Sequence, residues 1–153
     1  MKITDFLTPD RVIADLTEKD KSEVLKEMAG QLAETQPGLD AAQILQVLQD
    51  REKISTTAIG EGVAIPHGKL PNVQNVSALF ARSLQGVDFA SLDGEPTHLF
   101  FTLIAPQDAA ADHLKALARI SRLLKDPDLR RRLLTAATSQ ELYNIIAAED
   151  QKF

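Results

Sequence analysis

The stretch His98-Leu-Phe-Phe-Thr-Leu-Ile-Ala105 is an almost unbroken apolar run in the second half of the chain. Aromatic and β-branched residues favour extended structure. A strand that is apolar at nearly every position, on both of its faces, is typical of the centre of a sheet with helices above and below. This run therefore predicts a central strand that is buried on both sides.

Two segments that precede this run have a similar composition, rich in Val, Ile, Leu and Ala: Ala58–Ile65 and Val76–Arg82. Clusters of Gly, Pro, Asn and Asp separate the three segments, at residues 68–75 and at residues 93–96. Such clusters are typical of turns and loops. We therefore expect three strands joined by loops.

Helical patterns lie on both sides of this strand region. Asp20 followed by Glu23, and Thr138 followed by Glu141, have the spacing of a capping box at a helix start. Apolar residues then recur every three or four positions, which places them on one helical face: Val24, Leu25, Met28 and Leu32; Ile44, Val47 and Leu48; His113, Leu114, Leu117, Ile120, Leu123 and Leu124; Leu129, Leu133 and Leu134; Leu142, Ile145 and Ile146. Helices, then strands, then helices predict one α/β domain over residues 1–153, with a sheet covered by helices on both faces.

The composition excludes several classes of protein. The chain has 153 residues, a net charge of −5 and no cysteine. An acidic chain is a poor partner for nucleic acid or an anionic membrane, and a chain without cysteine has neither disulfides nor thiolate metal sites. The N-terminus lacks the apolar core of a signal peptide, and no apolar run has transmembrane length. We expect a cytoplasmic protein that neither binds nucleic acid nor inserts into a membrane.

The most distinctive motif is Gly60-Glu-Gly-Val-Ala-Ile-Pro-His-Gly-Lys69, which sets His67 between a proline and a glycine. Pro66 fixes its own φ and favours an extended residue before it. Histidine is a nucleophile whose charge changes near neutral pH. His67 on a restrained turn is a candidate carrier of a phosphoryl group; the alternative is a plain loop in which His67 is a surface or packing residue.

The other histidines have simpler interpretations. His98 is typical of a strand end, and His113 of a packed helix residue. The sequence lacks His-Glu-x-x-His, Gly-x-Ser-x-Gly and phosphate-loop motifs, so we predict neither a metal nor another cofactor. A zinc site built from distant segments stays an open alternative. Arg130, Arg131 and Arg132, with acidic neighbours, are typical of a solvated helix face.

Phosphoryl carriage requires one nucleophilic nitrogen and electropositive partners for the phosphoryl oxygens. Arg51 can offer a bidentate fork; alternatively, it is a helix-end charge that complements the helix dipole. Ser55, Thr56 and Thr57 can offer hydroxyl donors to the phosphate, or belong to a simple loop. His113 can offer one further hydrogen bond.

With these residues gathered, the chain resembles the IIA components of the phosphoenolpyruvate-dependent phosphotransferase system, fructose/mannitol class, and is most similar to their nitrogen-regulatory branch. Nearly the whole chain takes part in the resemblance. The motifs that carry it are Arg51-Glu-Lys53, Thr57-x-Ile-Gly-x-Gly-x-Ala-Ile-Pro-His-Gly-Lys69, Asp112-His-Leu114 and Glu141-Leu-Tyr-x-Ile-Ile146.

The resemblance implies a central mixed β-sheet flanked by helices on both faces, and no cofactor. It also implies that His67 is phosphorylated, that His113 is the second active-site histidine, and that Arg51 is the active-site arginine. Ala58 and Ser55 stand where the family usually has glycine. Both departures lie beside the site and concern its loop geometry.

The resemblance further implies an HPr-like phosphocarrier as the phosphoryl donor. For the acceptor, two expectations remain. In the first, the chain is a regulator that binds targets, such as potassium-transport proteins or sensor kinases, according to its phosphorylation state. Alternatively, it passes phosphate to a separate fructose- or mannitol-type IIB, a domain that uses cysteine in this class. Since this chain has no cysteine, the acceptor is expected on another chain.

Overall fold

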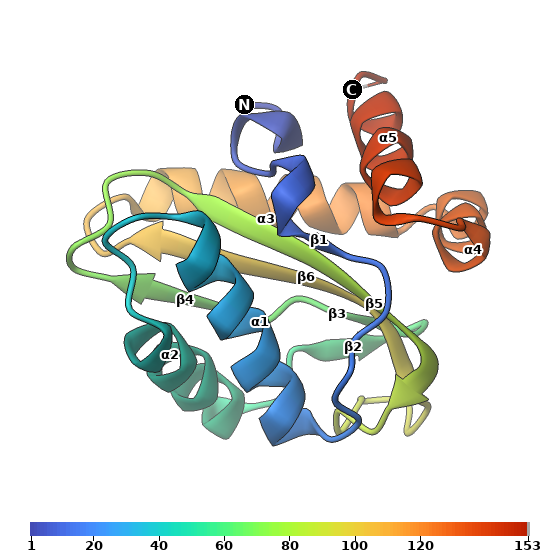
Figure 1. The fold of residues 1–153 in the computed structure, drawn as a ribbon, viewed down its shortest axis with the longest axis horizontal. Coiled ribbons are helices and arrows are strands. Elements are labelled where there is room, and N and C mark those ends of the chain that lie inside the picture. Colours follow the sequence, from blue (N-terminus) through green and yellow to red (C-terminus); the bar gives the residue numbers. More distant parts are fainter. Residues whose placement is uncertain (153) are drawn as a thin grey trace.

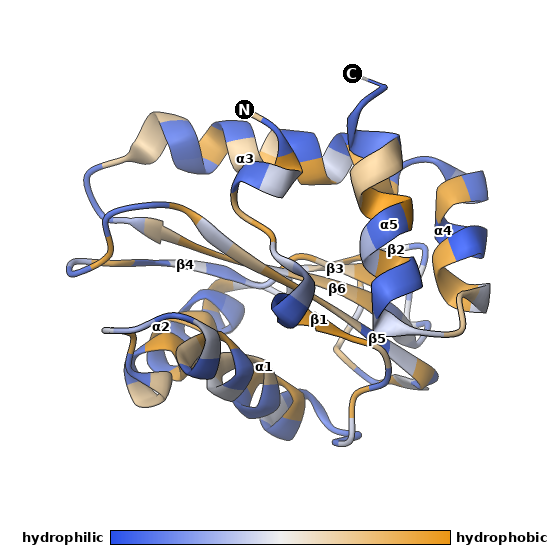
Figure 2. Ribbon diagram, turned by 45° about the horizontal axis from the view of Figure 1, so that its top comes forward, coloured by the Kyte–Doolittle hydropathy of each residue, from blue (hydrophilic) through white to orange (hydrophobic). Residues whose placement is uncertain are grey.

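The computed structural model describes residues 1–152. One mixed sheet lies between two layers of helices (Figure 1). Helices α1 (Lys21–Thr35) and α2 (Ala41–Ile54) cover one face, and helices α3 (Ala110–Leu124), α4 (Pro127–Thr135) and α5 (Ser139–Asp150) cover the other (Figure 2). The predicted fold class is confirmed.

Within residues 1–152, the sheet has six strands: β1 (Val12–Ile13), β2 (Ala58–Gly60), β3 (Val63–Ala64), β4 (His67–Leu70), β5 (Ser77–Val87) and β6 (Thr97–Pro106). Their order is β1-β5-β6-β3-β2, and β4 also pairs with β6. The pairs β5–β6 and β2–β3 are antiparallel, whereas β1–β5, β3–β6 and β4–β6 are parallel.

The helices begin where the capping signals predict. Asp20 accepts a hydrogen bond from the backbone of Glu23, and Thr138 accepts one from the backbone of Glu141. Asp126 caps α4 in the same way and precedes Pro127, which occupies the first turn. Two short 3-10 turns, Ile3–Asp5 and Pro9–Arg11, precede β1.

Strand β6 is buried on both faces, as its sequence predicts. Leu99, Phe101 and Leu103 belong to the core under α3, α4 and α5, whereas Phe100 and Ile104 belong to the core under α1 and α2. This alternation follows from the two-residue repeat of a strand. The central run therefore organises both cores at once.

The structure corrects three details of the sequence prediction. Residues 58–65 form two short antiparallel strands instead of one, because Gly60, Glu61 and Gly62 have φ values of 111°, 58° and 73° and turn the chain back. Residues 68–70, expected in a loop, belong to strand β4 because they pair with the far end of β6. Leu114, expected in the buried stripe of its helix, is 67% exposed.

Candidate active site

Strands β3 and β4 follow one another along the same edge of β6. Val63 and Ala64 pair with Leu99 and Phe100, and residues 67–70 pair with residues 103–106. Ile65-Pro66 interrupts this line, and Pro66 has no N–H to donate. Since β2 pairs only with β3, His67 begins a strand whose outer edge is not covered by another strand within residues 1–152.

The register of β4 decides which helix each of its residues faces. His67 lies opposite Leu103, so its side chain points toward the α3 layer. Gly68 lies opposite Ile104 and therefore faces α2. A Cβ atom on Gly68 would lie 2.7 Å from Cγ2 of Val47, so only glycine allows α2 to approach β4 this closely.

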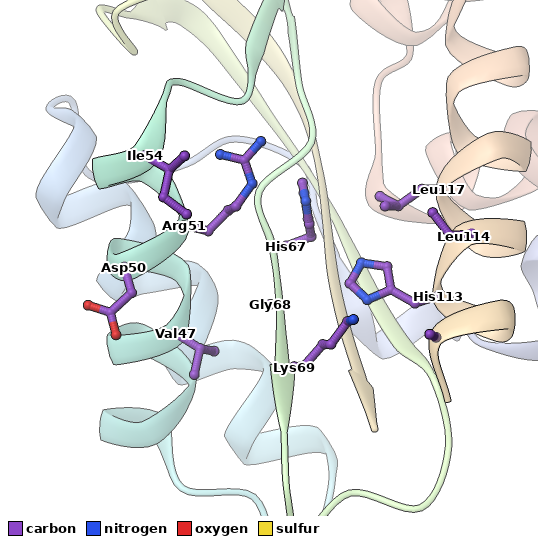
Figure 3. Close-up of a pocket in the computed structure, with 11 residues that line it drawn as sticks. Val47, Asp50, Arg51, Ile54, His67, Gly68, Lys69, His113, Leu114 and Leu117 are labelled. Atoms are coloured by element: carbon purple, nitrogen blue, oxygen red, sulfur yellow. The ribbon is translucent and has the colours of Figure 1, made fainter. Parts of the chain in front are cut away.

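A cleft of about 530 Å³ opens over β4, between α2 and α3. Figure 3 shows Arg51 of α2 on one side of β4 and His113 of α3 on the other, with His67 between them. Three predicted site residues from distant parts of the chain thus line one cleft. The lining residues are Val47, Asp50, Arg51, Ile54, His67, Gly68, Lys69, Ala110, His113, Leu114 and Leu117.

His67 has one ring nitrogen engaged and one left over. Its Nδ1 lies 2.8 Å from the carbonyl oxygen of Ile65. Because a carbonyl can only accept, Nδ1 carries the proton and donates it, and the lone pair of the neutral ring is on Nε2. Burial, with the positive charges of Arg51 and Lys69, lowers the pKa of His67, although the Ile65 hydrogen bond and Glu52 act in the opposite direction. The ring is therefore a neutral nucleophile at neutral pH.

His113 lies in the first turn of α3, where it is 5% exposed. Its ring meets that of His67 edge to face, with centroids 5.4 Å apart. Burial, together with the charges on His67 and Lys69, lowers the pKa of His113 to about 4. Its buried Nδ1 has no hydrogen-bond partner within the described part of the chain. His113 is thus a neutral imidazole with donor capacity to spare.

Arg51 makes a helix-end contact and also lines the cleft. It lies in the last turn of α2, where its Nη1 donates to the carbonyl oxygen of Ser55, 2.9 Å away, at the end of that helix. This contact satisfies a helix-end carbonyl and places positive charge at the negative end of the dipole. Guanidinium has five N–H donors, so Arg51 can also bind an anion in the cleft that it lines.

The predicted hydroxyl donors are not among the residues that line the cleft. Thr56 donates its hydroxyl proton to the carbonyl oxygen of Phe89, and Thr57 donates its own to the carboxylate of Glu52. Ser55 is the C-cap residue of α2. Phosphate binding by Ser55, Thr56 and Thr57 stays a prediction, and for the two threonines it requires an exchange of existing hydrogen bonds.

Three further side chains line the site, and the sequence analysis assigned no role there to two of them, Ile54 and Leu114. Lys69, two residues after His67, points to the same side of β4 and lines the cleft. Ile54 and Leu114, 79% and 67% exposed, form an apolar rim around the cleft. Leu114 follows His113 in the sequence but points away from the buried face of α3. The sequence alone would reveal this only once it is known which face of α3 packs on the sheet. Within residues 1–152, no group of three or more His, Cys, Asp or Glu side chains is placed to hold a metal ion.

Comparison with known proteins gives the class of protein to which this fold and site correspond. Residues 5–149 match the family described as "Phosphoenolpyruvate-dependent sugar phosphotransferase system, EIIA 2", and the chain belongs to this family. The resemblance deduced from the sequence is confirmed.

Similar proteins carry names of two kinds: nitrogen regulatory proteins and fructose-specific components of the phosphotransferase system. The chain is 46% identical over 147 residues to a protein named "Nitrogen regulatory protein" from Bradyrhizobium diazoefficiens, covering 96% of this chain and 95% of that one. It is 39% identical to the "PTS system fructose-specific EIIABC component" of Bacillus subtilis, covering 99% of this chain but 24% of that protein. The crystal structure of nitrogen regulatory protein IIA-Ntr from Neisseria meningitidis has a TM-score of 0.88 at 29% identity, covering 94% of this chain and 98% of that one.

None of the helices within residues 1–152 combines the length and the apolar character needed to cross a membrane.

Proposed function

We propose that residues 1–153 act as one phosphocarrier domain, which accepts a phosphoryl group on Nε2 of His67 from an HPr-like phosphocarrier. One observation carries this proposal: the hydrogen bond from Nδ1 to Ile65 directs the lone pair to Nε2, in a cleft lined by Arg51 and His113. A histidine with a fixed tautomer is ready for attack without prior proton transfer.

In the proposed step, Nε2 of His67 attacks the phosphorus of the donor's phosphohistidine. The new N–P bond forms as the donor's N–P bond breaks, and the donor imidazole recovers its electron pair. His67 keeps its proton on Nδ1 throughout, so its ring becomes positively charged. Arg51, Lys69 and an N–H of His113 stabilise the charge on the phosphoryl oxygens during transfer.

The rim of the cleft supplies a docking surface for the donor. Ile54 and Leu114 are exposed on opposite sides of His67, on α2 and α3 (Figure 3). Burial of such residues against a partner excludes water from the cleft, which strengthens the electrostatic contacts to the phosphoryl group. Apolar contact from both sides also aligns the two histidines for an in-line transfer.

We propose a regulatory role as the main function. The match to a nitrogen regulatory protein over nearly the full length of both chains supports it. Phosphorylation adds close to two negative charges and strong acceptor oxygens beside Arg51 and Lys69, which alters what can dock on the rim without refolding the sheet. Potassium-transport proteins and sensor kinases are the expected classes of target, and the cytoplasm is the expected location.

A second candidate function is transfer of the phosphoryl group to a separate fructose- or mannitol-type IIB. The 39% identity to one part of a fructose-specific EIIABC component supports this alternative. The two functions differ in a measurable way. Fast transfer from the phosphorylated chain to a purified IIB would favour the sugar-transport role, whereas slow transfer would favour regulation.

The direct test is incubation with labelled phosphoenolpyruvate, enzyme I and an HPr-like donor. We expect one acid-labile, base-stable phosphoryl group on each chain, and no label on His67→Ala. Label that persists in this variant would show that another residue carries the phosphate. The variant His98→Gln is a matched control, because His98 lies on β6 outside the cleft, and it should be labelled like the native chain.

A further inference from the structure

Glu52 occupies an unfavourable position for a carboxylate. It lies in the last turn of α2, where the negative end of the helix dipole opposes a negative charge. Its side chain is nevertheless only 5% exposed. A buried charge at such a place needs hydrogen-bond or ionic partners. The partners of Glu52 therefore show which residues it fixes in place.

Three donors fix the Glu52 carboxylate. Its Oε1 accepts from the backbone N–H of Thr57 at 3.0 Å and pairs with Nζ of Lys21 at 2.9 Å. Its Oε2 accepts the hydroxyl proton of Thr57. The Lys21 ammonium also lies 4.6 Å from the centre of the Phe89 ring, which holds it against the carboxylate. Glu52 therefore immobilises Thr57 at both its backbone and its side chain.

The backbone of Thr57 leads directly to the nucleophile. The carbonyl oxygen of Thr57 accepts from the N–H of Ile65 at 3.1 Å, and the carbonyl oxygen of Ile65 accepts from Nδ1 of His67 at 2.8 Å. Thr57 is 4% exposed, and Ile65 is 6% exposed. Two buried residues thus connect the Glu52 carboxylate to the imidazole.

We propose that Glu52 is a positioning residue for phosphoryl transfer, which fixes the Ile65 carbonyl through Thr57 and thereby holds the proton of His67 on Nδ1. This inference rests on the proposed function of His67. A ring that is phosphorylated on Nε2 and protonated on Nδ1 is a cation, so it needs both a fixed acceptor and a nearby negative charge.

The charges around His67 show why a carboxylate is needed there. Arg51 from α2 and Lys69 from β4 are positive, and both lower the pKa of His67. His113 from α3 lies against the ring, and Asp50 of α2 lines the same cleft. Among these groups, Glu52 is the buried carboxylate that acts on His67, and it raises the pKa of that ring. The phosphate-binding cations would otherwise disfavour the positively charged ring.

The test compares Glu52→Gln with Glu34→Gln, which removes the same charge at an exposed position of α1. In the unphosphorylated protein, NMR of the imidazole nitrogens reports the pKa and the tautomer of His67. We expect Glu52→Gln to lower this pKa and to populate the other tautomer, while Glu34→Gln changes neither. Transfer from the HPr-like donor should slow by about 10- to 100-fold in kcat with little change in KM.

Thr57→Val and Thr57→Ser keep the inference testable if Glu52→Gln does not fold. Valine removes the hydroxyl bond to Glu52, so the pKa and tautomer of His67 should shift in the same direction as in Glu52→Gln, and serine should restore both. A role of Thr57 in phosphate binding alone would leave the unphosphorylated ring unchanged.

The inference would be overturned if Glu52→Gln kept the native pKa and tautomer of His67 and the native transfer rate. It would also be overturned if Thr57→Val kept the native pKa and tautomer of His67. Failure of the native chain to accept phosphate would instead overturn the proposed function, because the NMR measurement requires no donor.

Discussion

The rings of His67 and His113 meet edge to face, with centroids 5.4 Å apart and planes at 89°. One ring belongs to the first residue of β4, and the other to the first turn of α3. Both pKa values are lowered, so the pair is neutral at neutral pH. In the proposed function, one neutral imidazole acts as the nucleophile and its neighbour offers an N–H as a hydrogen-bond donor.

The first prediction concerns this donor. His113→Ala should slow transfer to His67 by about 100-fold, since one positioned donor to a developing charge is worth about that factor. The variant should still accept label at His67 after long incubation. His113→Gln keeps a side-chain N–H and should recover part of the rate. A native rate in His113→Ala would reduce His113 to a packing residue.

The second prediction concerns pH. His113 has a pKa of about 4 in the folded chain and an ordinary value of 6.5. Between these values the unfolded chain binds a proton that the folded chain does not, so stability falls as pH decreases through this window. The loss due to His113 should be about 2 kcal/mol between about pH 7.5 and about pH 5, and the lowered pKa of His67 acts in the same direction.

Urea denaturation at the two pH values measures this loss. His113→Gln cannot take up the proton, so its stability should depend less steeply on pH than that of the native chain. Identical pH dependence in both proteins would show that burial does not lower the pKa of His113 in solution.

The sequence predicts the layers of the fold well, because its strongest signals are local. The capping residues Asp20 and Thr138 start helices where expected, and residues 98–105 form a strand covered on both sides. The short strand β4 is not predictable from such local signals. Residues 68–70 look like a loop, and only pairing with the far end of β6, more than thirty residues later, makes them a strand.

The site is predictable as a set of residue types but not as a geometry. The motif around His67 indicates a candidate nucleophile, yet nothing in it shows that Nδ1 meets the Ile65 carbonyl. The approach of Arg51 and His113 from opposite sides depends on how α2 and α3 pack on the sheet. The hydroxyls of Thr56 and Thr57 illustrate the converse: their sequence suits a phosphate site, but in the folded chain they already donate elsewhere.

The third prediction concerns the geometry of Arg51. Arg51→Lys keeps the positive charge but loses the planar fork that grips two phosphoryl oxygens. Transfer should slow by about tenfold or more, since one of the charge-assisted contacts is lost. The melting temperature should change little, because lysine at the end of α2 still complements the dipole. A native rate in this variant would confine Arg51 to its helix-end role.

The last prediction concerns the close contact between Gly68 of β4 and Val47 of α2. A Cβ atom on Gly68 would lie 2.7 Å from Cγ2 and 3.0 Å from Cβ of Val47. Gly68→Ala must therefore push α2 away from β4, at a cost of about 1–3 kcal/mol. Arg51 lies one helical turn after Val47 and would move with it, so transfer to His67 should slow as well.

A double-mutant cycle separates this displacement from the general effect of a glycine substitution. Val47→Ala removes both γ-methyl groups, including the one 2.7 Å from the added Cβ, but keeps the Val47 Cβ at 3.0 Å. The double variant with Gly68→Ala should therefore be more stable than the sum of the two single effects predicts, and should regain part of the transfer rate. Gly30→Ala is the control: that glycine lies within α1 with no atom within 4 Å of an added Cβ, so alanine should be neutral or stabilising by about 0.5–1 kcal/mol. Strict additivity between Val47 and Gly68, measured by urea denaturation, would mean that α2 does not rest on β4 at this point, and that the distance from Arg51 to His67 is set elsewhere.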